Sequence, residues 1–75
     1  MKKILITGGS GTVGTTFIKK YYKKFEFYNI SRNESQITEL KHKFPNVKNY
    51  VGDICDLEHL MSIFERVKPD VVIHS

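Results

Sequence analysis

The glycine-rich segment at residues 7–14 has the residue types and the spacing that bind phosphate groups. Gly8, Gly11 and Gly14 are arranged as G-x-x-G-x-x-G. Where a strand leads into a helix, the first glycine permits a tight turn, the middle one lets a pyrophosphate approach the backbone, and the last lets the helix pack against the strand. N–H groups and the positive end of the helix dipole then bind the phosphates. Further expected contacts are the Ser10 hydroxyl group and the backbone N–H groups of Thr12 and Val13.

Two other interpretations of this glycine segment have to be weighed. A plain strand-to-helix turn also uses glycine, but this spacing within a run of βα units makes it the weaker alternative. A P-loop requires G-x-x-x-x-G-K-[ST], and the sequence has no lysine between Lys3 and Lys19. The spacing therefore favours a dinucleotide site.

Ser31 and Arg32 directly follow the second predicted strand. They stand about 20 residues past the glycines, at the place where such a site distinguishes its cofactor. An acidic residue there binds the ribose 2′-hydroxyl group and favours NAD. The nearest acid, Glu34, already lies on the following helix. A guanidinium group instead binds a 2′-phosphate through paired hydrogen bonds, and a hydroxyl group can add another. We therefore expect NADP in preference to NAD; the alternative is that Arg32 is a solvated loop residue.

Asp53 and Ile54 follow the third predicted strand directly. A carboxylate there can accept a hydrogen bond from the adenine 6-amino group, and the Ile54 backbone can meet the edge of the ring. The alternative is a carboxylate that only stabilises a turn. Asp56 is better explained as the N-cap of the next helix. Because these roles account for the neighbouring acids, we expect no metal site.

Alternating strands and helices must position these residues. Ile4, Leu5 and Ile6 form a continuous apolar run, as in a parallel strand that is buried on both faces. The patterns predict strands at residues 3–7, 25–30, 47–51 and 71–74, and helices at residues 12–24, 34–44 and 57–67. The order βαβαβαβ predicts an α/β protein with a Rossmann-type parallel sheet and helices on both faces.

Helical spacing also predicts which side chains of the helices face the core. In the first helix these are Val13, Phe17, Ile18, Tyr21 and Tyr22. In the third helix they are Leu57, Leu60, Met61 and Phe64.

The composition is that of a small globular domain: 75 residues, 40% hydrophobic and 27% charged, with a formal net charge of +4. Much of the positive charge is a lysine cluster at the end of the first helix, so we expect a solvated face there and no nucleic-acid partner. The single cysteine excludes an internal disulfide. No apolar run approaches membrane-spanning length and none resembles a signal peptide, so we expect a cytoplasmic protein without a membrane segment.

Three motifs occur in order along the chain: ILITGGSGTVG at residues 4–14, VGDICD at residues 51–56 and PDVVIH at residues 69–74. Together they resemble the extended short-chain dehydrogenase/reductase family, and the resemblance covers essentially the whole chain. Within that family the chain is similar to nucleotide-sugar epimerases and dehydratases. The segment ISRNE at residues 30–34 is similar to the polysaccharide-biosynthesis branch that includes the UDP-N-acetylglucosamine 4,6-dehydratases.

The resemblance implies a tightly held NADP or NAD that takes a hydride from a UDP-sugar or other nucleotide sugar and returns it, in surface polysaccharide or glycan biosynthesis. It also implies a parent dehydratase or epimerase that is a homo-oligomer. In the family a Tyr-x-x-x-Lys pair and a Ser or Thr perform the acid–base chemistry, and this sequence contains no Tyr-x-x-x-Lys. The alternative is a non-catalytic module that binds NAD(P) as a regulator.

Residues 1–75 are therefore expected to be the N-terminal half of an NAD(P)-binding Rossmann domain, without its catalytic and substrate portion and inactive alone. The catalytic residues are unknown from this sequence. A chain this short is marginally stable, and the apolar residues 71–73 should form a strand at an edge of the sheet. We expect weak stability or association through that edge.

Overall fold

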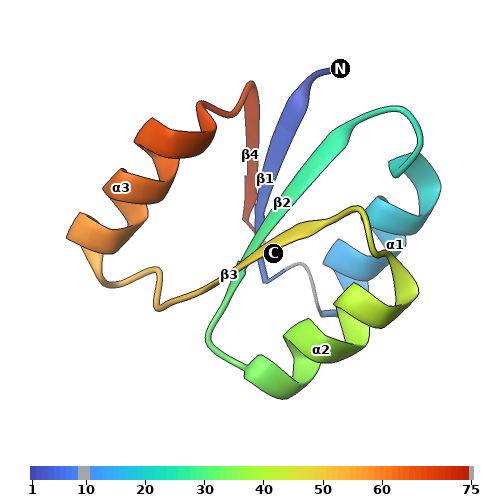
Figure 1. Cartoon of the computed structure of the whole chain (residues 1–75), viewed down its shortest axis with the longest axis horizontal. Helices are drawn as coiled ribbons and strands as arrows, with labels where there is room; N and C mark the ends of the chain where they lie inside the picture. Colours follow the sequence, from blue (N-terminus) through green and yellow to red (C-terminus); the bar gives the residue numbers. More distant parts are fainter. Residues whose placement is uncertain (9–10, 75) are drawn as a thin grey trace.

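The computed structural model of the chain describes residues 1–8 and 11–74. Strands and helices alternate within this part, as predicted (Figure 1). The elements are β1 (Lys3–Thr7), α1 (Thr12–Tyr21), β2 (Glu26–Ser31), α2 (Glu34–Lys43), β3 (Lys48–Val51), α3 (Leu57–Val67) and β4 (Val71–His74).

The strands form one parallel sheet in the order β3-β2-β1-β4. Helices α1 and α2 cover one face of the sheet, and α3 covers the other (Figure 1). Because all strands run in the same direction, their carboxyl ends meet at one edge, where Thr7 pairs with both Ile30 and His74. The Rossmann-type arrangement with helices on both faces is thereby confirmed.

Each face of the sheet has its own apolar layer, because successive side chains of a strand point to opposite faces. Strand β1 divides its side chains in this way: Ile4 and Ile6 contribute to one layer, and Leu5 to the other. The layer under α1 and α2 also contains the buried residues Ile18, Phe27, Leu40 and Val47. The layer under α3 also contains Tyr28, Ile30, Ile63 and Val67.

The predicted core face of α3 was only half right. Leu60 and Phe64 pack against the core, but Leu57 and Met61 are exposed, and the buried residues of the helix are Ile63 and Val67. The apolar stripe of α3 is wider than the sheet face it covers, so spacing alone did not show which part would be buried. In α1, Ile18 is buried as predicted. Val13 in the same helix and Tyr22 directly after it are exposed, against expectation.

Strands β1 and β4 and helix α3 have the predicted bounds, and the other elements differ from prediction by one to three residues at an end. Helix α1 ends at Tyr21 instead of residue 24, because the Tyr21 carbonyl accepts from the N–H groups of both Lys24 and Phe25 and so closes a turn. Strand β2 extends to Ser31, which makes that residue the last of the strand. Strand β3 begins one residue later than predicted, at Lys48, and α2 ends one residue earlier, at Lys43.

Two helix N-termini are capped by side chains, and the cap at Asp56 was predicted. Asn33 Oδ1 accepts from Gln36 N at 3.1 Å, and Asp56 Oδ1 accepts from His59 N at 3.2 Å. These caps occupy N–H groups that the helix itself leaves without partners, and they fix where α2 and α3 begin. Within residues 1–8 and 11–74, no helix is long and apolar enough to span a membrane.

Candidate functional site

A pocket of about 490 Å³ lies at the carboxyl edge of the sheet. Its volume falls within the roughly 300–1,000 Å³ that small-molecule and cofactor sites occupy. Its lining comes from the last residues of β1, β2 and β4, from the loops that follow β1, β2 and β3, and from α2: Thr7, Gly8, Ile30, Ser31, Arg32, Asn33, Gln36, Gly52, Asp53, Ile54, Cys55 and His74. This is where α/β sheets bind their ligands, because the loops that leave parallel strands converge there.

Five of the predicted cofactor residues line this one pocket, although they come from three separate segments of the chain: Gly8, Ser31, Arg32, Asp53 and Ile54. Gly11, Val13 and Gly14 belong to the adjoining start of α1 and are not among the lining residues. Ser10 lies outside the described residues, and the backbone of Thr12 begins α1. These five residues therefore lie together at one pocket, and their roles in binding a cofactor stay predictions.

The glycine turn has the geometry that its residues require. Gly8 has a φ of 76°, a left-handed conformation in which a side chain is strained. Its N–H donates to Ile30 O at 3.0 Å, and its carbonyl accepts from Gly11 N at 3.0 Å. A Cβ on Gly11 would lie only 3.3 Å from the Gly8 carbonyl oxygen. The turn is therefore tight at both positions.

The start of α1 is suited to an anion. Gly11 is the N-cap and has no side chain that accepts a hydrogen bond, and the first turn contains no acidic residue. The positive end of the helix dipole is therefore not neutralised by a carboxylate of its own first turn. Gly14 is buried in that turn, as expected for the glycine that packs against the sheet, whereas Val13 is exposed.

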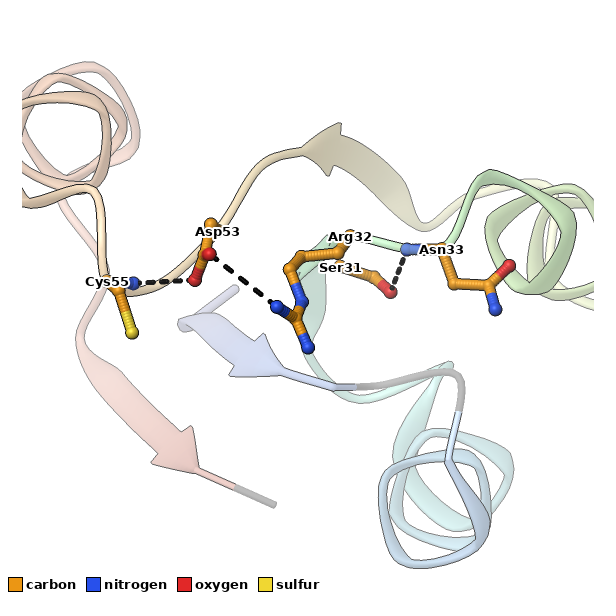
Figure 2. A network of polar contacts seen from close by, with 5 residues as sticks. All are labelled: Ser31, Arg32, Asn33, Asp53 and Cys55. Carbon is orange, nitrogen blue, oxygen red and sulfur yellow. Dashed lines mark hydrogen bonds and ion pairs between the residues drawn. The ribbon is translucent and has the colours of Figure 1, made fainter.

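An ion pair connects the ends of β2 and β3 across the pocket. Arg32 Nη1 lies 3.6 Å from Asp53 Oδ2 (Figure 2). The other carboxylate oxygen of Asp53, Oδ1, accepts from Cys55 N at 2.9 Å. The Arg32 side chain is 78% exposed and that of Asp53 is 44% exposed. The carboxylate is thus held by its own loop, while the guanidinium group reaches into the pocket from solvent.

The electrostatics of Asp53 follow from these contacts. The Cys55 backbone N–H is the main reason that the pKa of Asp53 lies below its ordinary value. The Cys55 thiol group and the Arg32 guanidinium group lower that pKa further, and burial opposes them. Asp53 is therefore an anion at neutral pH.

Ser31 faces the pocket from the last position of β2. Its Oγ accepts from Asn33 N at 3.2 Å (Figure 2), and its carbonyl accepts from Gly52 N at 3.0 Å. The second bond joins the end of β2 to the loop that carries Asp53. The first bond uses the Ser31 hydroxyl group as an acceptor, so its O–H can still donate to a ligand.

The sequence prediction omitted several residues that line the pocket, among them Thr7 and His74. Thr7 Oγ1 and His74 Nδ1 lie 2.6 Å apart, because β1 and β4 are neighbours in the sheet. His59 on α3 is half-buried, and its Nε2–H donates to Val51 O at 3.1 Å. For the contact between Thr7 and His74, the sequence offered only the predicted order of the strands. For the contact between His59 and Val51, it offered no local pattern.

Known proteins resemble the chain over nearly its whole length. The family described as GDP-mannose 4,6 dehydratase matches residues 5–74. The chain is 36% identical to the dTDP-glucose 4,6-dehydratase of Haemophilus influenzae over 81 aligned residues. The alignment covers 99% of this chain and 24% of that enzyme. The chain is 37% identical to the UDP-N-acetylglucosamine 4,6-dehydratase (inverting) of Campylobacter jejuni over 79 aligned residues, which are 99% of this chain and 23% of that enzyme.

A solved structure supports the same assignment. The Bordetella bronchiseptica enzyme WbmG, in complex with NAD and UDP, superimposes with a TM-score of 0.84 at 29% identity, over 96% of this chain and 24% of that one. The chain spans about a quarter of the length of the curated relatives it matches. The predicted resemblance to nucleotide-sugar dehydratases and epimerases is confirmed, and the chain belongs to the GDP-mannose 4,6 dehydratase family.

Proposed function

We propose that this chain is the NAD(P)-binding portion of a nucleotide-sugar 4,6-dehydratase or epimerase, and that it prefers NADP. The observation that carries the proposal is the pocket at the carboxyl edge of the sheet, where Arg32 and Asp53 lie beside the glycine turn. The relatives named as 4,6-dehydratases and the NAD in the WbmG structure support a nicotinamide cofactor.

The residues present fit such a cofactor. Gly8 and Gly11 form a tight turn before the start of α1, so backbone N–H groups can approach a pyrophosphate closely. Arg32 supplies a positive charge at the end of β2, where a 2′-phosphate would lie, and the Ser31 O–H can donate to the same group. Asp53 and Ile54 line the side of the pocket proposed for the adenine ring.

The roles of this chain's residues are to bind and orient the cofactor. When bound, the nicotinamide group supplies reversible hydride transfer. The glycine turn would anchor the pyrophosphate, and the loops after β2 and β3 would set the position of the adenosine. No Tyr-x-x-x-Lys pair occurs in residues 1–75, so the proton transfers of the parent enzyme are assigned to residues outside them.

Calorimetric titration of the chain with NADPH and NADH tests this proposal, with circular dichroism to show that the protein is folded. We expect NADPH to bind more tightly. Arg32→Ala should weaken NADPH binding roughly 10- to 100-fold, the loss that follows when a charge-assisted hydrogen bond is removed. NADH binding should change much less, because NADH has no 2′-phosphate.

Arg66→Ala is the matched control, because Arg66 lies in the last turn of α3 and is the other arginine of the chain. It should leave both affinities unchanged. A folded chain that binds neither nucleotide would contradict the proposed function. Equal binding of both nucleotides, unaffected by Arg32→Ala, would contradict only the preference for NADP.

We further propose that residues 1–75 are the N-terminal part of a larger NAD(P)-binding domain, whose parent acts on a UDP-sugar or other nucleotide sugar. The relatives' names and the UDP in the WbmG structure support this substrate class. A cytoplasmic location and a homo-oligomeric parent stay predictions. A purified parent protein that shows no change in any nucleotide sugar supplied with NADP or NAD would contradict the proposed activity.

A further inference from the structure

We propose that Asp53 is a specificity-determining residue that competes with a 2′-phosphate for Arg32. The proposal rests on the proposed function, because it concerns the same nucleotide pocket. Its starting point is the ion pair between Arg32 Nη1 and Asp53 Oδ2, which links the loop after β2 to the loop after β3 (Figure 2).

The two partners are held very differently. Asp53 Oδ1 is fixed by the Cys55 N–H, and the Asp53 carbonyl accepts from Asp56 N at 2.9 Å. The Arg32 side chain has a single described partner, Asp53, and is 78% exposed. A ligand can therefore turn Arg32 away from Asp53, whereas it cannot easily move Asp53 away from its loop.

The relative strengths of the two pairs decide which partner Arg32 takes. An exposed ion pair at 3.6 Å contributes little, since both charges remain hydrated. A 2′-phosphate carries more negative charge and can accept two parallel hydrogen bonds from one guanidinium group. We therefore expect Arg32 to leave Asp53 when the nucleotide has a 2′-phosphate, and to stay with Asp53 when it has only a 2′-hydroxyl group.

This exchange of partners has a cost for nucleotides that carry a 2′-phosphate. Their binding must break the Arg32–Asp53 pair, and it places a phosphate near the Asp53 carboxylate, which repels it. The structure thus predicts that Asp53 reduces the preference for NADP that Arg32 creates. Removing the charge of Asp53 should raise this preference.

Asp53→Asn tests the proposal with little change in shape, because the asparagine Oδ1 can still accept from Cys55 N. The probes are adenosine 2′,5′-bisphosphate and 5′-AMP, which differ only in the 2′-phosphate. The measured quantity is the ratio of their affinities. A contact between residue 53 and the adenine ring affects both probes equally and cancels in that ratio.

We expect Asp53→Asn to raise the ratio in favour of the bisphosphate by about 2- to 5-fold, the range that an exposed ion pair supplies. In an Arg32→Ala background the same substitution should have a smaller effect, since no guanidinium group is left to release. Glu34→Gln is the matched control: it removes one negative charge from the first turn of α2 and leaves the Arg32–Asp53 pair in place. That variant should leave the ratio unchanged.

The outcomes separate this proposal from the proposed function. If the wild-type chain favours the bisphosphate through Arg32 but Asp53→Asn leaves or lowers the ratio, the role of Asp53 is overturned and the nucleotide site stands. An equal rise of the affinity ratio in Asp53→Asn and Glu34→Gln also overturns it, since the rise then follows from the loss of any nearby negative charge. A folded wild-type chain that binds neither probe overturns both proposals.

Discussion

The imidazole ring of His59 lies directly against Gly52. A Cβ on residue 52 would meet His59 Cδ2 at 2.4 Å and Nε2 at 2.6 Å, closer than such atoms approach in proteins. The same ring donates from Nε2–H to Val51 O at 3.1 Å. His59 therefore holds the end of β3 against α3, next to the loop that carries Asp53, and the contact requires glycine at position 52.

Gly52→Ala should destabilise the chain because the new methyl group displaces the His59 ring and breaks its bond to Val51. We expect a loss of about 1 kcal/mol in the free energy of unfolding, the lower end for overpacking, since His59 is only half-buried and can move. Urea denaturation followed by circular dichroism measures this loss.

The double variant Gly52→Ala/His59→Ala is the control for that mechanism. Each single substitution should be destabilising, but together they should cost less than their sum, because the methyl group then has no ring to displace. Additive effects, or a Gly52→Ala chain as stable as the wild type, would show that the contact with His59 is not what excludes a side chain at position 52.

The hydroxyl group of Tyr28 should lose its proton only at unusually high pH. Its burial, and then the hydrogen bond from its hydroxyl group to Glu26 Oε1 at 2.8 Å, raise the pKa of Tyr28 to about 12. In the unfolded chain its pKa is about 10, so the folded state retains the proton longer. The resulting stabilisation is fully present below pH 10 and is lost as the pH rises towards 12.

Absorbance at 295 nm, recorded for the wild type and for Tyr28→Phe, measures this ionisation by difference. The difference should titrate near pH 12. Glu26→Gln should lower the pKa of Tyr28 only in part, because burial is the larger cause. A difference that titrates at about 10, the ordinary value, would contradict the buried position of the phenol.

Strand β4 should make the chain associate, because it is an apolar strand at an edge of the sheet. Val72 is 45% exposed there. The opposite edge, β3, carries Lys48, a type of residue that discourages pairing with another chain. We expect the sedimentation coefficient of the wild type to rise with concentration, and Val72→Lys to reduce that rise.

Val51→Lys is the matched control for this prediction. Val51 is 50% exposed and ends β3 at the other edge of the sheet. The same change there should leave association unaltered. A wild-type chain that stays monomeric at all concentrations, or equal effects of the two lysine variants, would show that β4 is not the associating edge.

The local features of the chain were predictable because they depend on residues close together in sequence. The apolar run in β1, the glycines after it and the periodicity of the helices defined where elements begin and end to within a few residues. Asp56 was recognised as an N-cap, since a cap contacts an N–H group only two or three residues away. The Gly8 turn was predicted in the same way.

The buried face of α3 was predicted less well. Its apolar stripe includes Leu57, Leu60, Met61, Ile63 and Phe64, and helical spacing does not show which part of a wide stripe meets the sheet. The position of α3 over the sheet made Ile63 and Val67 the buried residues and left Leu57 and Met61 exposed. Packing between elements, and not periodicity, determined this outcome.

By itself, the sequence determined the order of elements, the glycine turn and the residue types that follow each strand. Only the tertiary structure decided which of those residues meet. Arg32 pairs with Asp53, and Thr7 contacts His74, 67 residues further along the chain, because β1 lies between β2 and β4 and β3 lies beside β2. Local propensities act over a few residues, whereas contacts between strand ends depend on the order and register of the whole sheet.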